Sequence, residues 1–343
     1  MSKINVIGLD LAKNVFQVHG INEDGDVVVR KQLKRAEVLR YFAKLPPCLV
    51  GMEACMSAHY WAREISKLGH VVRLIAPAFV KPYVRGNKND RNDAEAICEA
   101  VQRPNMRFVA AKTPEQQAVL HLHHARQLLV QQRVALNNHL RAVLLEYGVS
   151  LPVGVKVLSQ ALPGLLEDGD NALPMLTRHL LAELKTAHDA LNKHIQMIEN
   201  PLQAWHQSNP VSQRLAQIPG IGLLTATALA ATLGDIHVFK NGRHLAAFLG
   251  LVPKQHSSGG KDKLLGISKR GDGYVRGLLI HGARAVMRHI QRRIKLGQAS
   301  GNRWVEQCLK RMHVNKVIVA LANKMARMAW ALLAHQQDYR AAA

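Results

Sequence analysis

The sequence predicts an α/β domain at the N-terminus, a long helical middle region and a mostly α-helical C-terminal domain. Short apolar runs and turn clusters alternate with helically spaced residues up to about residue 110. A neutral stretch with leucines at three-to-four spacing follows, and glycine turns divide short helices beyond it. We therefore expect modules at residues 1–110, 111–207 and 208–343, which suits a chain of 343 residues.

The first module alternates between strands and helices. The expected strands span 4–9, 15–19, 27–32, 48–52 and 71–75. The expected helices span 36–45, 58–68 and 90–102. The order β-β-β-α-β-α-β-α predicts an antiparallel meander that continues into a mixed sheet covered by helices.

The middle module should contain two long helices. The first starts at the Thr113-Pro114 cap signal and runs for about 35 residues, and the second runs from about Pro174 to Trp205. Prolines and glycines make residues 150–173 a turn-rich connector. The two helices are expected to pair antiparallel or as a coiled coil, forming an arm for assembly or partner binding rather than for chemistry.

The last module is expected to combine short helices with glycine turns. The expected helices span 223–233, 243–250, 273–293 and 314–336, with a loop at 254–271. The segment Ile218-Pro-Gly-Ile-Gly222 resembles a helix-hairpin-helix turn, in which Gly220 and Gly222 would present backbone amides to phosphate. A purely structural turn is an equal alternative for this segment.

The chain is strongly basic, and the excess of positive charge lies toward its C-terminal end. Lys and Arg number 46 against 24 Asp and Glu, giving a formal net charge of +22. Residues 201–343 hold 21 basic and five acidic side chains, whereas residues 111–200 hold eight of each. This predicts a polyanionic partner, and nucleic acid is favoured over a membrane because the cations are spread out. Arg284 and Arg288 recur at helical spacing and should follow phosphates.

The sequence favours a cytoplasmic protein without a membrane span. No apolar run of about 18 residues lacks a polar break, and the N-terminus enters a strand pattern directly. The four cysteines have no C-x-x-C spacing, so buried reduced thiols are expected. His121, His123 and His124 lie on different helix faces and are expected to be exposed polar positions or RNA contacts.

Four acidic residues of the first module form the strongest chemical pattern. Asp10 and Glu53 each follow an apolar strand, and Asp90 and Asp93 lie three residues apart at a helix start, on one side of it. If the two strands are neighbours, all four carboxylates converge at one sheet edge and suit Mg²⁺ or Mn²⁺. Two such ions could activate a nucleophile and stabilise a departing oxygen in phosphodiester transfer. Taken singly, each acid is more typical of a turn or a helix cap.

A serine in the last module is surrounded by basic residues. The cations near Ser258 are Lys254, Lys261, Lys263, Lys269 and Arg270. A serine hydroxyl needs a base, a metal or a strongly positive field to act as a nucleophile, and these cations could hold the phosphate and stabilise its developing charge. Taken alone, the same residues favour a flexible basic loop that only contacts phosphates.

Several segments resemble one protein family. Ile-Gly-Leu-Asp10-Leu-Ala-Lys, Gly51-Met-Glu53-Ala and Asn87-Lys-Asn-Asp90-Arg-Asn-Asp93-Ala look like the signature of the DEDD transposases of bacterial insertion sequences. The N-terminal domain of that family is similar to the RuvC resolvase, which has an RNase H-like fold. Segments 215–222, 245–253 and 258–271 look like the family's C-terminal transposase domain.

The resemblance implies a mechanism and a set of partners. In that family a C-terminal serine attacks DNA and becomes covalently linked to it, and motif matching places this serine at Ser258, with Ser257 as the neighbour that an alignment could confuse with it. Mg²⁺ or Mn²⁺ is expected at the four acids, and the DNA partners are the element's ends and its target. Some members use a guide RNA transcribed from the element. Since two or more DNA ends react in one complex, a dimer or tetramer is expected.

Two other functions remain as alternatives. A structure-selective nuclease of the RuvC type would use the acids to activate water, with the serine as a mere contact. A non-catalytic nucleic-acid-binding protein would need neither the four acids nor the serine for its activity. The sequence contains no G-x-x-x-x-G-K-[ST] motif for ATP binding. A reaction through a covalent intermediate needs no ATP, because the intermediate conserves the energy of the phosphodiester bond.

Overall fold

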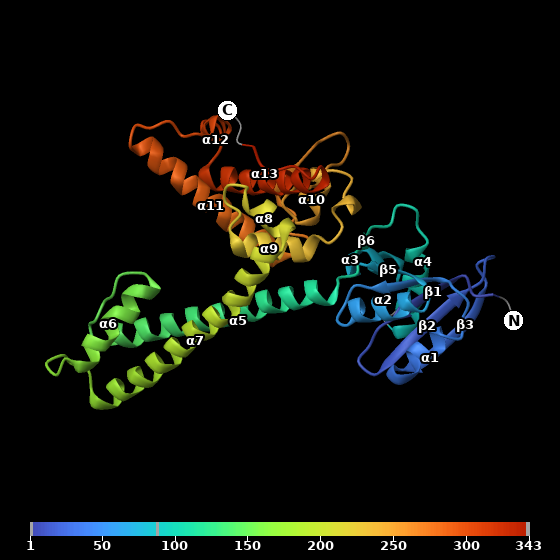
Figure 1. Ribbon diagram of the computed structural model, residues 1–343, viewed down its shortest axis with the longest axis horizontal. Helices are drawn as coiled ribbons and strands as arrows, with labels where there is room; N and C mark the ends of the chain where they lie inside the picture. Colours follow the sequence, from blue (N-terminus) through green and yellow to red (C-terminus); the bar gives the residue numbers. More distant parts are fainter. Residues whose placement is uncertain (1–2, 87–88, 341–343) are drawn as a thin grey trace. The chain divides into compact units, whose positions relative to one another are not determined.

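The computed structural model describes residues 3–86 and 89–340, and the chain divides into two compact units (Figure 1). The first unit is Met1–Pro114 and the second is Glu115–Ala343. The long helices of the middle region belong to the same unit as the C-terminal helices, so the division into three modules stays a prediction.

The first unit is built on a mixed six-stranded sheet with the strand order β3-β2-β1-β4-β5-β6. Its strands are β1 (Val6–Asp10), β2 (Val15–Ile21), β3 (Val27–Lys34), β4 (Leu49–Glu53), β5 (Val71–Ile75) and β6 (Phe108–Val109). The first three form an antiparallel meander, β1, β4 and β5 run parallel, and β6 returns antiparallel. The mixed sheet follows the expected order, with the short edge strand β6 as an addition.

Helices cover both faces of this sheet. They are α1 (Val38–Phe42), α2 (Ala58–Lys67), α3 (Pro77–Val80) and α4 (Asp90–Val101), with 3-10 turns at Arg35–Glu37 and Lys81–Tyr83. One core joins α1 and α2 to Leu9 and Phe16, and a second core joins α4 to Val6 and Ile75. Because Val6 and Leu9 point to opposite faces of β1, these are the two sides of one sheet.

Two long helices of the second unit run antiparallel beside each other. They are α5 (Pro114–Glu146) and α7 (Met175–Ser208). Hydrogen bonds join them along their length, between the pairs Glu115–Trp205, Arg126–Glu199 and Arg133–Asn192, and another joins Tyr147, just after α5, to Thr177. The antiparallel pairing is therefore observed, while a supercoil of the two helices stays a prediction.

The expected turn-rich connector is wrong, because helix α6 (Val155–Glu167) occupies most of it. Leu158 and Leu162 lie one turn apart on this helix, and both are buried against Leu140, Leu144 and Leu181 of the long helices. Pro163 is accommodated inside the helix. Burial of this apolar face outweighs the helix-breaking tendency of the proline and glycine residues.

The rest of the second unit packs around its last helix. Its helices are α8 (Pro210–Ala216), α9 (Leu223–Leu233), α10 (Gly242–Phe248), α11 (Gly273–Lys295), α12 (Arg303–Leu309) and α13 (Val314–Ala334), with a 3-10 turn at Ile236–Val238. Helix α13 is long and apolar enough to cross a membrane by length and composition, but one face of it, including Val317, Leu321 and Met325, is buried in the protein core. A core helix explains this composition.

The loop expected at 254–271 is in part a β-hairpin. Strands β7 (Pro253–Gln255) and β8 (Leu264–Ile267) pair antiparallel, and a bridge joins Ser258 to Lys261 at the tip. The two residues between them, Gly259 and Gly260, both have positive φ, as a type I′ hairpin turn requires. The glycine pair at the tip of the hairpin thus closes an ordered turn.

Candidate active site

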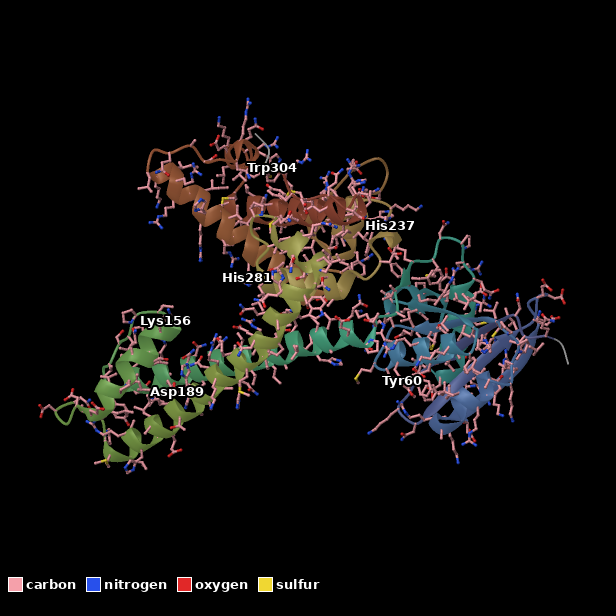
Figure 2. The ribbon with its side chains drawn as sticks, viewed as in Figure 1. Tyr60, Lys156, Asp189, His237, His281 and Trp304 are labelled. Carbon is pink, nitrogen blue, oxygen red and sulfur yellow. The ribbon has the colours of Figure 1, made fainter. Side chains whose placement is uncertain are left out.

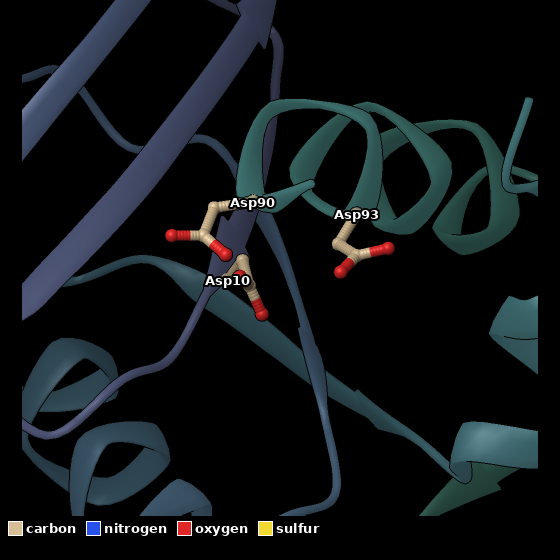
Figure 3. Close-up of side chains that lie close together, drawn as sticks. All are labelled: Asp10, Asp90 and Asp93. Atoms are coloured by element: carbon tan, nitrogen blue, oxygen red, sulfur yellow. The ribbon is translucent and has the colours of Figure 1, made fainter. Parts of the chain in front are cut away.

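Three carboxylates from distant parts of the sequence meet at one edge of the sheet. Asp10 ends β1, and Asp90 and Asp93 occupy the first turn of α4. One oxygen from each of the three lies within 4.8 Å of the others (Figure 3). Asn89 caps the helix by accepting a hydrogen bond from the Asn92 amide at 2.9 Å, which fixes where α4 begins.

Glu53 lies at the end of the neighbouring strand. Strands β1 and β4 are parallel and Leu9 is opposite Met52, so Asp10 and Glu53 both end their strands at the same sheet edge. Glu53 does not belong to the group of three, yet its charge helps to raise the pKa of Asp10. The structure therefore brings three of the four predicted acids together and places the fourth beside them.

Two glycines allow α4 to reach this edge. Gly8 and Gly51 are paired across β1 and β4, each two residues before an acid and on the same face as it. A Cβ atom on Gly8 would collide with the Ala94 carbonyl oxygen and lie 2.5 Å from the Cys98 amide nitrogen, and one on Gly51 would lie 2.8 Å from Val101 Cβ. The repeated pattern glycine, apolar residue, acid is a signal that the sequence analysis missed.

The electrostatics of this carboxylate cluster favour a cation. Burial, and after it the charges of Asp93, Asp90 and Glu53, raise the pKa of Asp10 to about 6, while a hydrogen bond from the Leu11 amide lowers it. The donors are carboxylate oxygens throughout, which suits Mg²⁺ or Mn²⁺ rather than zinc. The residues present thus fit the metal expected from the sequence.

Ser258 lies in the second unit, at the tip of the β7–β8 hairpin. It is exposed, as are all five cations near it in sequence, Lys254, Lys261, Lys263, Lys269 and Arg270. The neighbouring Ser257 differs in its contacts, because its hydroxyl oxygen accepts a hydrogen bond from Gln255 Nε2 at 2.9 Å. The hairpin turn therefore presents Ser258 to solvent within a positive field.

The two glycines of the turn that was expected to bind phosphate have different surroundings. Gly220 has a φ of +90°, and a Cβ there would lie 2.9 Å from the Gly282 carbonyl oxygen of α11, so packing alone accounts for this glycine. Gly222 is exposed at the start of α9, with open space where a Cβ would lie. Of the two, Gly222 is the one that lies exposed at a helix start, where backbone amides have no partner within the helix.

Helix α11 carries an exposed basic stripe. Arg284, Arg288, Arg292 and Lys295 are all exposed, and they follow His281, which is labelled in Figure 2. The opposite face of α11, including Leu279, Ala283 and Met287, is buried in the core. This amphipathic arrangement leaves the cations free to meet phosphates.

A groove with a largely apolar floor and several cations, which the sequence analysis missed, lies between α13 and the β7–β8 hairpin. It has a volume of about 1330 Å³, and its lining includes Arg243, Lys316, Lys324 and Arg327 but no acidic residue among those described. Trp304, labelled in Figure 2, also lines it, and Lys324 Nζ lies 4.6 Å from the centre of the Trp304 ring. Cations beside tryptophan rings suit nucleic acid, because phosphates can pair with the cations and bases can stack on the rings.

His123 is not an exposed position, contrary to the expectation. Its side chain is completely buried and bridges α5 to two C-terminal helices, with Nδ1 2.9 Å from Tyr274 Oη and Nε2 3.0 Å from Thr227 Oγ1. Burial, and after it the charge of Arg126, lowers the pKa of His123 to about 4. Packing of α5 against α9 and α11 buries this ring, whereas His121 and His124 remain exposed.

The cysteines are all free thiols. Cys48, Cys98 and Cys308 are buried, and Cys55 is half-buried. Burial raises the pKa of Cys48 to about 11 and that of Cys98 to about 12, so both thiols stay protonated.

Comparisons with known proteins match both units. Residues 7–149 match a transposase family of the DEDD type named for IS110, and residues 212–298 match the family described as transposase IS116/IS110/IS902. The chain is 51% identical to a probable family 20 transposase of Pseudomonas aeruginosa, over 97% of this chain and 98% of that protein. It is 44% identical to the transposase for insertion sequence element IS1111A of Coxiella burnetii, over 100% and 93% of the two chains. It is also 44% identical to the transposase for IS1328 of Yersinia enterocolitica, over 96% and 97%.

Proposed function

The chain belongs to the IS116/IS110/IS902 family of transposases, enzymes that mobilise insertion sequences, and we propose that it cuts and rejoins DNA with a carboxylate site and a serine nucleophile. The carboxylates are Asp10, Asp90 and Asp93 with Glu53 beside them, and the serine is Ser258. The observation that carries the proposal is the convergence of three carboxylates from β1 and α4, which are 80 residues apart in the sequence, within 4.8 Å.

The carboxylates would hold Mg²⁺ or Mn²⁺. Asp10 is part-buried at the end of β1, and Asp90 and Asp93 are held by the capped start of α4, so all three are positioned before any ligand arrives. When bound, the ion would polarise the phosphate and stabilise the leaving oxygen. Glu53 would either coordinate the same ion or orient the phosphate that the ion binds.

Ser258 would supply the nucleophile. Its Oγ would bond to phosphorus as the bond between phosphorus and one ester oxygen breaks, the hydroxyl proton would pass to a base, and the departing DNA oxygen would take up a proton. Lys254, Lys261 and Lys263, on the same hairpin, would stabilise the charge of the phosphate during this step. A DNA hydroxyl then displaces the serine and rejoins the strand without ATP.

The basic surfaces of the second unit would hold the nucleic acid. The stripe on α11 with Arg284 and Arg288, the exposed start of α9 at Gly222 and the groove beside α13 all offer donors to phosphates. We further propose a guide RNA and a dimer or tetramer as partners, in line with the charge of residues 201–343 and the need to join two DNA ends. Sequencing of nucleic acid that copurifies with the protein tests the RNA partner directly.

A covalent-adduct assay tests the serine. Wild-type protein incubated with element-end DNA and Mg²⁺ should yield protein-bound DNA on a denaturing gel, and Ser258→Ala should yield none. Ser257→Ala is the matched control and should retain the adduct. Asp10→Ala should lose both cutting and adduct while still binding DNA. Full cutting by Ser258→Ala would instead show that activated water is the nucleophile, and unchanged cutting by Asp10→Ala would contradict the carboxylate site.

A further inference from the structure

A separate polar pocket adjoins the carboxylate cluster on the side of β2 and β3. It has a volume of about 610 Å³ and is lined by the start of α4 and by side chains of the two strands. Its polar lining includes Gln17, His19, Arg30, Gln32, Asn89, Asp90, Arg91, Asn92 and Glu95. Since most ligand pockets are mainly apolar, this lining selects a ligand with many hydrogen-bonding groups.

The strand register explains why the pocket is polar. Asp10 is opposite Gln17, and Gln17 is opposite Gln32, so one acid and two amides form a row on a single face of the sheet. In the next row Gly8 is opposite His19, and His19 is opposite Arg30. The row that ends in the catalytic acid therefore continues directly into the pocket.

One side chain of the pocket lacks the partner that its burial demands. Gln17 is only 5% exposed, and its Oε1 atom has no hydrogen-bond partner among the described residues. A buried acceptor of this kind is unfavourable unless a donor is supplied from outside. A ligand that carries an N–H group and enters the pocket would supply it.

The charged groups of the pocket favour a nucleotide. Arg30 and Arg91 are exposed at its rim, and Arg30 Nη2 lies 3.6 Å from Glu95 Oε2 in the second turn of α4. Arginine binds phosphate in a two-pronged geometry, while asparagine and glutamine pair with the hydrogen-bonding edges of bases. Both kinds of group occur here next to the residues that would cut a phosphodiester.

We propose that this pocket receives one unpaired nucleotide next to the cleaved phosphodiester, with Gln17 Oε1 accepting a hydrogen bond from the amino group of its base. The inference rests on the proposed function of the carboxylate cluster. Such a base no longer stacks on its neighbours, and the protein recognises it through the hydrogen-bonding groups on its edge, as in other enzymes that extrude a nucleotide. The nucleotide comes from the DNA strand being cut or from a bound RNA, and adenine, cytosine and guanine all carry the required group.

The test compares full-length wild-type protein with Gln17→Leu, which keeps the side-chain size but removes the acceptor. Cutting is measured on DNA carrying each of the four bases at every nucleotide flanking the cleaved bond. Wild type should cut substrates with an amino-bearing base at one position about tenfold faster than the others, and Gln17→Leu should lose that preference, its rate on the preferred substrates falling to the rate on the others. Gln102→Leu, at the exposed far end of α4, is the matched control and should keep the preference.

A second arm identifies an RNA source and checks folding. RNA that copurifies is probed with dimethyl sulfate, and a base protected by wild type but exposed in Gln17→Leu would place the RNA in the pocket. Unchanged base preference and unchanged RNA protection in Gln17→Leu, with a normal thermal unfolding profile and Mg²⁺ response, would overturn the inference. Cutting that survives Asp10→Ala would instead overturn the proposed function, so the two failures are distinguishable.

Discussion

At the scale of single residues, Asp10 and the glycine before it show how the cluster is built. The carboxylate is partly buried among three other acids, and this raises its pKa to about 6. The apolar face of α4 holds the acids together against their repulsion, because Gly8 lets the helix approach the sheet closely. Charge repulsion and close packing therefore oppose each other at this edge.

Removal of one acid should change the response to metal. Asp93→Asn should unfold at a higher temperature than wild type in EDTA, because one repulsive charge is gone. Mg²⁺ should stabilise wild type, by about 1.4 kcal/mol at ten times its dissociation constant, and stabilise the variant much less. Thermal unfolding followed by circular dichroism measures both effects, with Asp24→Asn in an exposed turn as the control. An equal Mg²⁺ response of all three proteins would contradict a metal site at these carboxylates.

The glycine on β1 should be intolerant of even a methyl group. Gly8→Ala forces α4 away from the strand, so we expect a loss of about 1–3 kcal/mol in the free energy of unfolding and a weaker Mg²⁺ response. Gly277→Ala on α11 meets nothing within 4 Å and should be neutral or stabilising, by up to about 1 kcal/mol. Urea unfolding of both variants measures the contrast, and equal stabilities would show that helix position does not depend on Gly8.

At the scale of elements, His123 joins α5 to α9 and α11. Thr227 Oγ1 donates its hydrogen to the Leu223 carbonyl oxygen at 2.8 Å, so His123 Nε2 donates to Thr227. The pKa of about 4 keeps the ring neutral near pH 7, and Nδ1 then accepts from the Tyr274 hydroxyl. Protonation of Nδ1 would remove this acceptor. The junction between these three helices therefore depends on the protonation state of one buried ring.

Acid should weaken this junction. The pKa of His123 is about 4 in the folded protein and 6.5 in the unfolded chain, so the unfolded state binds the proton first as the pH falls. The contribution of neutral His123 to the free energy of unfolding is therefore fully present above pH 6.5 and is lost as the pH falls from 6.5 to 4. We expect the free energy of unfolding of wild type to fall by about 2 kcal/mol between pH 7 and pH 5 because of this residue, and we expect this part of the fall to be missing in His123→Gln. His59, also with a pKa of about 4, acts in the same direction in the first unit, so the difference between wild type and variant isolates His123.

At the scale of the whole molecule, charge and chemistry are distributed between the two units. The acidic cluster belongs to the first unit, whereas residues 201–343 carry 21 basic side chains and five acidic ones. Within the second unit, most of the helices α5 and α7 lies in residues 111–200, which hold eight basic and eight acidic side chains. Nucleic-acid affinity should therefore come mainly from the C-terminal region.

The salt dependence of DNA binding checks this distribution. Replacement of both Arg284 and Arg288 by Gln should weaken binding to duplex DNA and reduce the slope of log K against log salt by about 2, since each cation releases about one counterion. Lys156→Gln on α6, labelled in Figure 2, is the control and should leave the slope unchanged. Fluorescence anisotropy over a salt series measures the slopes, and equal slopes for all three proteins would contradict phosphate contact by α11.

The elements that periodicity alone could predict are those with strong local patterns. Strands around Leu9 and Val50 and the long helix from Pro114 follow from apolar spacing and cap residues within a short window. Helix α6 was missed because Pro163 and the nearby glycines mask an apolar face that matters only when Leu158 meets Leu140. The hairpin β7–β8 was missed because its strands are short and exposed.

The sequence by itself determined the α/β order of the first unit, the four acids as candidates, the basic C-terminal region and, through its motifs, the transposase family. Tertiary structure alone decided that Asp10, Asp90 and Asp93 approach within 4.8 Å while Glu53 lies beside them, that His123 is buried, and that Gln17 continues the row from Asp10 into a pocket. The physical reason is that spacing along a chain records local periodicity. Cross-strand register and the distance of closest approach between a helix and a sheet arise only when distant segments pack together.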